Sequence, residues 1–413
     1  MTSALKSVDA HLDDILSTVA PLSAIDVQLL EAHGSVLFED VTSPGPLPSF
    51  DNSAMDGYAV IRADLAGASI EEPVRLPVVG DIAAGAGHPP SVSPGLCVRI
   101  MTGAPMPAGA DAVVPVEWTD GGIANVTITR WPGEGAHVRR TGEDVSAGDV
   151  VLTEGSHLGA AQLGLLAAVG RSRVLAMPRP RVVVVSTGSE LVEPGHPTRP
   201  GQIWDSNSVL LTLAAREAGA VAYRVGIVPD DPRQLLDALE DQLIRADVIV
   251  TSGGVSVGAY DVVKEVLGRL GTVAFDRVAM QPGMPQGFGT IGPDATPIFA
   301  LPGNPVSAMV SFEVFVRPAL RRLLGAESLH RPLLRAVIDE PLQSPPGKRQ
   351  YARARLAEPA GARARVLLVG GSGSHLIGSL AHANALIVVP EEVTSVAAAE
   401  EVDVLVLERR SAP

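Results

Sequence analysis

The sequence predicts a multidomain protein of the α/β plus β class, with a central α/β domain and β-rich regions before and after it. Three observations predict this class. Strands alternate with helices between residues 181 and 323, which is typical of a mostly parallel sheet covered by helices on both faces. Short β-like runs separated by Gly and Pro fill residues 60–139, and helices stop after about residue 328. A length of 413 residues agrees with two to four domains.

The N-terminal region, residues 7–33, is predicted to form two helices. Ser23 and Asp26 stand in a capping-box pattern before LLEAHG, and Gly34 is expected to follow the second helix. The next stretch, TSPGPLPSFDNSAMDGYAV at 42–60, is rich in Pro, Gly and Asp, so it marks a boundary.

A small all-β lobe is expected next, because four β-like runs follow one another between Gly and Pro clusters: VRLPVV, LCVRIM, DAVVPV and NVTITR. An apolar helix at 158–169 ends at Gly170. The α/β region then has predicted strands at 182–186, 223–228, 247–252, near 272–275 and 297–301, and predicted helices at 206–218, 232–245, 260–269 and 305–323. The C-terminal strands are expected within HRPLLRAVIDEPL, RQYARARL, ARVLLVGG and NALIVVPEE.

Composition and charge limit the classes of partner. The hydrophobic fraction is 46% but aromatic residues make up only 3%, so the cores are built mainly from Val, Leu, Ala and Ile. A net charge of −14 argues against a nucleic-acid or anionic membrane partner, which requires a basic surface. The same charge means that an anionic ligand needs local positive charge from backbone N–H groups, arginine or a metal.

The compartment is predicted to be the cytoplasm. Cys97 is the single cysteine, which excludes a disulfide within the chain and a thiolate metal site. The first residues have early acidic side chains and no apolar segment of the signal-peptide kind. The most apolar stretch, residues 158–170, is too short to span a bilayer.

The segment VIVTSGGVSVGAYDVVK at 248–264 contains the most informative turn of the α/β region. Ligands bind at the carboxyl ends of the strands in an open parallel sheet, and residues 251–258 lie at such an end. Glycines allow close approach of the backbone, and the N–H groups that open the next helix favour an anion. The turn is therefore interpreted as a cradle for a phosphate-like group. It is not a Walker A loop, since Ala259 and Tyr260 replace Lys and Ser/Thr. A plain glycine turn that packs the helix on the sheet is the alternative.

Three further loops follow strands at the same edge. STGSEL at 186–191 carries Glu190, PDDP at 229–232 carries Asp230 and Asp231, and LPGNPVS at 301–307 carries Asn304. Asp231 is expected to cap the helix that begins at Pro232. Carboxylates beside an anion cradle repel each other unless a cation binds, and Mg²⁺ held by one or two carboxylates and substrate phosphate resolves this. A solvated acidic rim is the alternative.

Several long motifs in one order resemble the MoeA family of molybdopterin molybdenumtransferases, which includes the E domain of gephyrin. They are PLPSFDNSAMDGYAV (46–60), RIMTGAPMPAGADAVVP (99–115), RRTGEDV (139–145), STGSEL, TSGGVSVGAYDVVK, LPGNPVS and GSGSH (371–375). The resemblance covers essentially the whole chain. It implies an elongated four-domain subunit that works as a homodimer, with a helical hinge region, a central domain similar to MogA-type molybdopterin adenylyltransferases, and a C-terminal β-barrel-like domain.

On this chain the four domains would be residues 1–45 with 140–178, then 46–139, 179–327 and 328–413. The implied reaction inserts molybdenum from molybdate into adenylylated molybdopterin and releases AMP, with Mg²⁺ required. The resemblance also implies contact with a molybdopterin adenylyltransferase and with apo-molybdoenzymes.

Site residues follow by matching motif to motif. The catalytic residues implied are Asp56, Thr102, Asp144, Glu190, Asp230 and Asp261, with Glu190, Asp230 and Asp261 holding Mg²⁺. The substrate-binding residues implied are Thr187, Gly188, Ser252, Gly253, Gly254, Ser256, Gly258, Arg277, Pro302, Asn304, Pro305, Arg353 and Ser374. In the family the site lies between subunits, so Asp56 and Thr102 would face the partner's sheet. Arg353 is expected to hold an oxyanion bidentately.

The segment FDRVAMQPGMPQGFG at 275–289 departs from the family pattern. Many relatives have lysines where this chain has Arg277, Gln281 and Met284, so anion binding is expected to be weaker or arranged differently. Compensating charge is available in GKRQYAR from Lys348, Arg349 or Arg353, unless this stretch is only a solvated basic loop.

Three functions remain open from the sequence. The first is molybdenum insertion, which the carboxylates favour. The second is a non-catalytic paralogue that binds molybdopterin or a protein partner as a scaffold, which the missing lysines favour. The third is adenylylation of molybdopterin by the α/β domain, against which the additional β domains argue. Tungstate is not distinguished from molybdate, because the two oxyanions have nearly the same size and charge.

Overall fold

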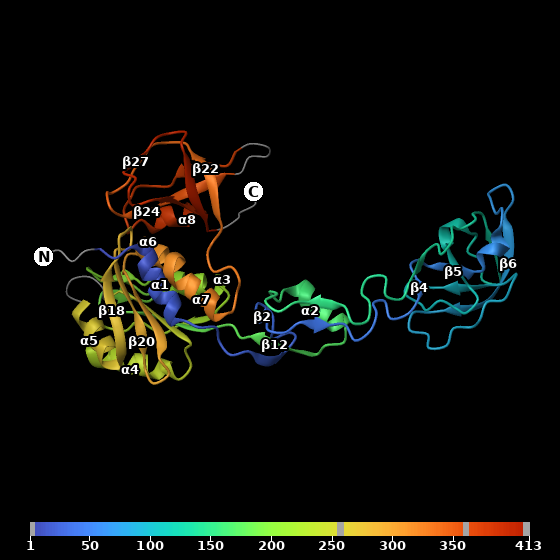
Figure 1. The fold of residues 1–413 in the computed structure, drawn as a ribbon, viewed down its shortest axis with the longest axis horizontal. Coiled ribbons are helices and arrows are strands. Elements are labelled where there is room, and N and C mark those ends of the chain that lie inside the picture. The colour runs from blue at the N-terminus through green and yellow to red at the C-terminus, as the bar shows by residue number, and fades with distance from the viewer. Residues whose placement is uncertain (1–4, 254–259, 358–362, 408–413) are drawn as a thin grey trace. The chain divides into compact units, whose positions relative to one another are not determined.

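The computed structural model describes residues 5–253, 260–357 and 363–407 (Figure 1). The chain packs into two compact units, which are described separately. The first unit comprises residues 1–27, 32–38 and 175–413, and the second comprises residues 28–31 and 39–174. Among the described residues, no helix is long and apolar enough to cross a membrane.

A six-stranded sheet forms the centre of the first unit, in the order β16-β13-β17-β21-β20-β18. The first four strands pair in parallel, and β20 and β18 are antiparallel additions at one edge. The bounds are β13 (Arg181–Ser186), β16 (Val221–Arg224), β17 (Val248–Ser252), β18 (Gly271–Arg277), β20 (Pro285–Ile291) and β21 (Thr296–Leu301). The mostly parallel sheet predicted from the sequence is confirmed.

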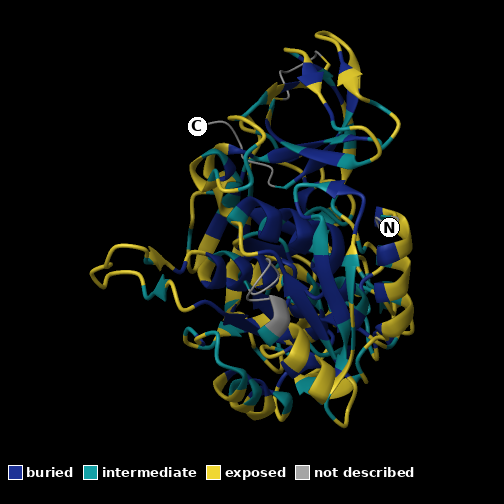
Figure 2. Cartoon of the chain, turned by 90° about the vertical axis from the view of Figure 1, so that its left-hand side faces the viewer, coloured by how far each residue is buried: buried dark blue, intermediate teal, exposed yellow. Residues whose placement is uncertain are grey.

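Helices cover both faces of this sheet, because its central strands are apolar on both sides. Val182 and Val184 face a core shared with α1 (Val8–Thr18), α3 (Asn207–Glu217), α6 (Pro305–Ser311) and α7 (Arg317–Leu323). Val183 and Val185 face a second core with α4 (Pro232–Leu243) and α5 (Tyr260–Leu270). Figure 2 shows the buried strands in dark blue, with the exposed surfaces of helices around them.

Several boundaries differ from the predictions. The predicted helix 305–323 continues through a π-helical segment, η3 (Phe312–Val316), between α6 and α7. Strand β16 ends at Arg224 although the sequence predicted a strand at 223–228. Strand β20 was missed because it contains glycine and proline; Gly287 and Gly289 are required there, since a Cβ on Gly289 would lie 2.0 Å from the Thr272 carbonyl oxygen.

Of the two helices predicted at the N-terminus, the first is confirmed and the second is wrong. Helix α1 forms, with the Ser7 hydroxyl accepting a hydrogen bond from the Ala10 amide at 3.1 Å. The second predicted helix is replaced by strand β1 (Ile25–Gln28) and a turn that reaches Gly34 at φ +81°. Strand β1 belongs to a three-stranded sheet with β12 (Arg173–Met177) and β2 (Val36–Leu37), so sheet pairing overrides the local capping-box signal.

A closed β-barrel forms the C-terminal part of the first unit. Strand β24 pairs with both β25 and β26, while β22 and β28 complete the ring. Strand β19 (Met280–Gln281) pairs in parallel with the start of β24. The barrel bounds are β22 (Leu333–Ile338), β24 (Arg349–Ala357), β25 (Arg365–Leu368), β26 (Ala385–Val389) and β28 (Glu401–Val406), of which β28 was not predicted. A short helix, α8 (Ile377–His382), precedes β26.

The second unit contains the predicted β lobe. Its five-stranded sheet has the order β8-β5-β7-β6-β9, with bounds β5 (Gly57–Val60), β6 (Val74–Ile82), β7 (Cys97–Ile100), β8 (Ala112–Pro115) and β9 (Asn125–Ile128). The sequence placed β5 within a boundary segment, yet all four of its residues are buried. A Cβ on Gly57 would lie 2.0 Å from the Val114 carbonyl oxygen, so this close pairing requires glycine. The predicted apolar helix is α2 (Ala160–Ala168).

Candidate active site

A cavity of about 960 Å³ opens at the carboxyl ends of the parallel strands in the first unit. The loops after β13, β17 and β21 line it, together with Asp230, residues 280–285, Lys348 and residues 372–375 near the barrel. Ten of the predicted site residues therefore meet in one place: Thr187, Gly188, Glu190, Asp230, Ser252, Gly253, Pro302, Asn304, Pro305 and Ser374. This position agrees with the rule that open α/β sheets bind ligands at this edge.

The remaining predicted residues lie elsewhere or outside the description. Gly254, Ser256 and Gly258 fall outside the described residues, and of Asp261 only the backbone, within α5, is described. Arg277 and Arg353 are not among the described residues that line the cavity. Asp56, Thr102 and Asp144 belong to the second unit.

The glycine turn brings two strand ends unusually close. Gly253 has φ +101°, and a Cβ at this position would lie 2.3 Å from the Thr187 carbonyl oxygen. The Thr187 amide donates a hydrogen bond to the Ser252 carbonyl at 3.0 Å. Glycine is therefore required for the contact between the loops after β13 and β17, and this contact shapes the cavity wall.

Asn207 was missed by the sequence reasoning, although it connects these loops. Its side-chain amide Nδ2 donates to Ser252 Oγ at 2.8 Å and to the Gly303 carbonyl at 2.6 Å. It thus joins the ends of β17 and β21 from the first turn of α3. The available signal was the polar run IWDSNS at 203–208, immediately before an apolar helix pattern.

Asp205 supports the same corner of the cavity. Its Oδ1 accepts hydrogen bonds from Ser186 Oγ and from the Ser208 amide, both at 3.0 Å. Its Oδ2 is buried without a hydrogen-bond partner in the described protein and lies 3.8 Å from Arg224 Nη1. Thr187 Oγ1 and Asn207 Oδ1 are likewise buried and unpaired. Buried polar atoms are normally paired, so these three oxygens mark the part of the cavity wall that is best suited to polar ligand groups or water.

The predicted carboxylates are exposed to the cavity. Glu190 and Asp230 both line it, and Asp230 Oδ2 accepts a hydrogen bond from the Ser189 amide at 3.2 Å. Asp231 instead caps α4, accepting from the amides of Arg233 at 3.1 Å and Gln234 at 2.9 Å, which confirms its predicted role. In the PDDP loop, Asp230 therefore lines the cavity, while Asp231 caps the helix.

These carboxylates are compatible with Mg²⁺ that is shared with a substrate. Magnesium is usually bound by one or two protein carboxylates plus phosphate oxygens and water, and Glu190 and Asp230 are the described cavity residues that would supply the carboxylates. In the part of the chain that the structure describes, no three His, Cys, Asp or Glu side chains cluster as a complete metal site. The third predicted ligand, the side chain of Asp261, lies outside the described residues.

The loop from the barrel is fixed by two contacts. Asn304 Nδ2 donates to Ser374 Oγ at 2.9 Å, and the Val306 amide donates to the Ser374 carbonyl at 3.1 Å. Because Ser374 Oγ accepts the hydrogen bond from Asn304, the hydroxyl hydrogen of Ser374 remains available for donation to a ligand. Two predicted substrate-binding residues from distant parts of the chain are thus in direct contact.

Arg353 lines a smaller cavity, which shares Gln281, Pro282 and Ser372 with the main one. Its Nη1 donates to the Gly373 carbonyl at 3.1 Å, and its Nη2 donates to the Gly371 carbonyl. Burial lowers the pKa of this guanidinium from its ordinary value. These contacts hold the GSGSH loop, while Arg353 Nε is buried without a hydrogen-bond partner in the described protein, so the bidentate contact with an oxyanion stays a prediction.

In the second unit, Asp56 and Thr102 are in direct contact. Thr102 donates from its amide at 2.7 Å and from its hydroxyl at 2.8 Å to Asp56 Oδ1. The hydrogen bond from the Thr102 backbone, followed by that from its side chain, lowers the pKa of Asp56. Asp144 is exposed, and its amide donates to the Leu47 carbonyl at 3.1 Å. Two of the three predicted residues of this unit thus form one rigid, exposed pair.

Family models match most of the chain. The MoeA N-terminal region (domain I and II) matches residues 6–170, the probable molybdopterin binding domain matches 183–322, and the MoeA C-terminal region (domain IV) matches 335–407.

Named relatives agree with these matches along the full length. Molybdopterin molybdenumtransferase 2 of Mycobacterium tuberculosis is 48% identical over 406 residues, which cover 97% of this chain and 99% of the relative. Molybdopterin molybdenumtransferase of Haemophilus influenzae is 37% identical, with 92% of each chain covered. A crystal structure of the molybdopterin biosynthesis MoeA protein from Pyrococcus horikoshii has a TM-score of 0.76 at 32% identity and covers 98% of this chain and 100% of its own. This chain therefore belongs to the MoeA family of molybdopterin molybdenumtransferases.

Proposed function

We propose that this protein inserts molybdenum from molybdate into adenylylated molybdopterin and releases AMP, in a reaction that requires Mg²⁺. The observation that carries this proposal is the cavity at the sheet edge, where Glu190, Asp230, Asn304 and Ser374 meet around the Gly253 turn. The full-length identity to named molybdopterin molybdenumtransferases supports the same reaction.

Each group has a role in this proposal. Glu190 and Asp230, with Asp261, would hold Mg²⁺, and the bound cation would neutralise phosphate charge and polarise the phosphoanhydride of the substrate. Ser374 donates its hydroxyl hydrogen to an oxo group, and Asn304 fixes the direction of that donation through its hydrogen bond to Ser374 Oγ. Gly253 and Asn207 hold the loops at the spacing in which the cavity forms.

We further propose that the protein works as a homodimer, in which Asp56, Thr102 and Asp144 of one subunit complete the cavity of the other. The exposure of Asp56 supports this part of the proposal, because a rigid carboxylate at the surface of the second unit is available to another chain. A molybdopterin adenylyltransferase would supply the substrate, and apo-molybdoenzymes would receive the product. The single cysteine is compatible with action in a reducing compartment, and we place the reaction in the cytoplasm.

A second candidate function is a paralogue that binds molybdopterin without turnover. One observation favours it: Gln281 and Met284, at positions where the family resemblance implies lysine, both line the cavity as uncharged side chains. The cavity is therefore less positive than the family pattern predicts, and weak oxyanion binding would leave a binding protein rather than an enzyme.

The substitution Glu190→Gln tests the enzymatic proposal. It keeps the side-chain shape and removes the charge that would hold Mg²⁺, so we expect AMP release that depends on molybdate to fall at least tenfold, with an unchanged melting temperature. Glu240→Gln on the exposed face of α4 is the matched control and should leave AMP release unchanged. Full activity in Glu190→Gln would remove this carboxylate from the mechanism.

A further inference from the structure

The described residues around the cavity carry more negative than positive charge, which is unfavourable for binding an oxyanion. Among the residues that the structure describes, the carboxylates that line the cavity are those of Glu190, Asp205 and Asp230. Among the described lining residues, Lys348 is the only lysine or arginine. The chain as a whole carries a net charge of −14, so the surrounding field does not favour an anion either.

The neighbouring cationic side chains are occupied by other contacts. Arg349 donates to both carboxylate oxygens of Asp9 at 2.8 Å and lies 3.1 Å from Glu391. The hydrogen bonds that Arg349 donates to Asp9, followed by its interactions with Tyr351 and Glu391, raise the pKa of Arg349 despite its partial burial. Arg353 donates to loop carbonyls, and Arg277 contacts the sulfur of Met284 at 3.7 Å without lining the cavity. Of the three candidates in GKRQYAR, only Lys348 therefore reaches the cavity.

Lys348 also lies beside the segment that carries the uncharged cavity residues Gln281 and Met284. The Arg349 amide donates to the Ala279 carbonyl at 2.9 Å, and Met280 and Gln281 pair in parallel with Arg349 and Gln350. This pairing fixes the start of β24 against residues 279–281, next to the cavity positions of Gln281 and Met284. Lys348 is half-buried, and the described protein gives its ammonium group no hydrogen bond or ion pair.

We propose that Lys348 is the oxyanion-binding side chain of this cavity, since it is the one lysine or arginine among the described residues that line it. Its ligand is a tetrahedral oxyanion, either free molybdate or a phosphate group of the adenylylated substrate. An ammonium group provides three N–H donors on a flexible stem, so it reaches an oxyanion from the barrel side while Glu190 and Asp230 lie on the sheet side. This inference rests on the proposed function, since it concerns the same cavity.

The first experiment measures binding directly and does not need turnover. Lysines are Lys6, Lys264 and Lys348, so reductive methylation with ¹³C-formaldehyde gives a spectrum with three lysine signals and the N-terminal amine. Methylation keeps the positive charge, and Lys348→Arg assigns the signal by its disappearance. Molybdate alone and AMP alone are titrated separately, so that the two sources of oxyanion are distinguished.

We expect the Lys348 signal to move in a saturable way with at least one of the two anions. The Lys6 signal is the internal control, because Lys6 is bound to Asp14 and Asp276 away from the cavity. A Lys348 signal that stays fixed with molybdate and with AMP overturns the inference. If the wild-type protein releases no AMP but the Lys348 signal still moves, the proposed function fails while the inference stands.

The second experiment separates binding from the chemical step. Lys348→Met should raise the KM for the anion it binds about tenfold or more while kcat changes less, since the lost contact is a charge-assisted hydrogen bond. Met284→Lys in the same chain should restore the affinity, because it returns a cation to the cavity. Arg355→Met, an exposed residue on the same strand, is the control for net charge. Unchanged anion affinity in Lys348→Met would contradict the role.

Discussion

Thr102 directs two hydrogen-bond donors, its amide at 2.7 Å and its hydroxyl at 2.8 Å, at one carboxylate oxygen of Asp56 across 46 positions of sequence. This contact keeps an exposed carboxylate ionised and in one orientation, since each hydrogen bond favours its charged form. A nearby pair has the same geometry: Thr141 donates from its amide at 2.7 Å and its hydroxyl at 2.8 Å to Asp51. The second unit therefore contains an internal control.

Thr102→Val should raise the pKa of Asp56 toward its ordinary value, because the hydroxyl donor is lost while the amide donor remains. We expect AMP release to fall and the melting temperature to stay within error, since the pair is exposed. NMR titration of the Asp56 carboxyl carbon and an AMP assay measure the two effects. Thr141→Val should raise the pKa of Asp51 without lowering AMP release. Equal losses of activity in both variants would indicate a structural effect rather than a role for Asp56.

Asn207→Leu should lower the free energy of unfolding by about 1–3 kcal/mol, because it leaves Ser252 Oγ and the Gly303 carbonyl without their shared donor. Urea unfolding of the wild type and the variant measures this cost. A double-mutant cycle of Asn207→Ala with Ser252→Ala should show a coupling energy of about 1 kcal/mol. Strict additivity of the two substitutions would mean that the hydrogen bond does not hold the strand ends together.

The Cys97 thiol is fully buried in the second unit, and burial raises its pKa to about 12. Almost no thiolate is present at pH 8, so the native protein should not react with a disulfide reagent such as DTNB. One thiol per chain should react after unfolding in guanidinium chloride. Rapid stoichiometric reaction of the native protein would contradict the burial of β7.

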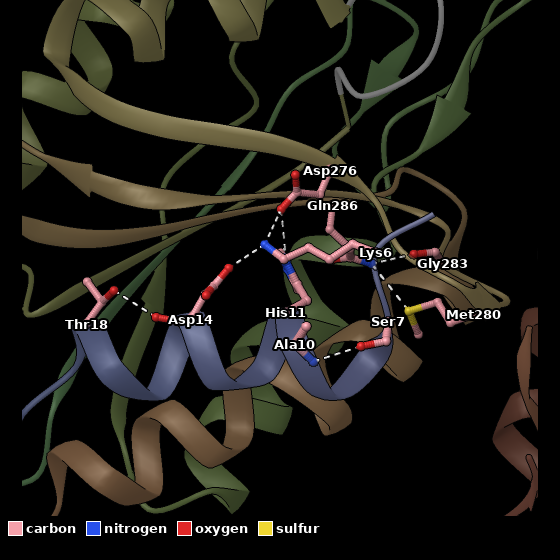
Figure 3. Close-up of polar contacts among 10 residues, drawn as sticks. All are labelled: Lys6, Ser7, Ala10, His11, Asp14, Thr18, Asp276, Met280, Gly283 and Gln286. Atoms are coloured by element: carbon pink, nitrogen blue, oxygen red, sulfur yellow. Dashed lines mark hydrogen bonds and ion pairs between the residues drawn. The ribbon is translucent and has the colours of Figure 1, made fainter. Parts of the chain in front are cut away.

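His11 makes the stability of the first unit depend on pH. Its pKa is lowered from 6.5, first by burial and then by the charge of Lys6, although Asp276 at 3.3 Å and Asp14 oppose this (Figure 3). Because the folded pKa is depressed, the unfolded chain binds more protons below pH 6.5. The contribution of neutral His11 to the free energy of unfolding is therefore fully present above pH 6.5, and it is lost as the pH falls toward the folded pKa.

His11→Gln removes this titration, so the difference in unfolding free energy between wild type and variant should shrink as the pH falls from 7.5 to 5. Urea unfolding at several pH values measures it. A difference that stays constant over this range would show that His11 does not titrate differently in the folded and unfolded chains.

The position of the site could be predicted from the sequence because its signals are local. Apolar strands followed by loops that carry Gly253, Glu190 and Asn304 are sufficient to place these residues at one sheet edge, whatever the remainder of the chain does. A local signal also assigned different roles to Asp230 and Asp231: Pro232 marks a helix start, so Asp231 was expected to cap that helix.

The errors concern residues whose role depends on distant partners. Asn207 resembles an ordinary polar residue at a helix start until Ser252 and Gly303 are brought beside it. The contacts of Arg353 with the Gly371 and Gly373 carbonyl oxygens were also missed, because they form only once the GSGSH loop has folded against β24. The predicted helix at Ser23 had a correct local pattern and was overridden by the sheet pairing of β1.

The most direct test of the central claim is AMP release from adenylylated molybdopterin by the purified protein with Mg²⁺, measured with and without molybdate. The account predicts release that depends on molybdate, which would also show that Gln281 and Met284 are tolerated in a cavity that contains Lys348. Tight binding of the substrate with no AMP release under either condition would contradict it and identify a binding paralogue.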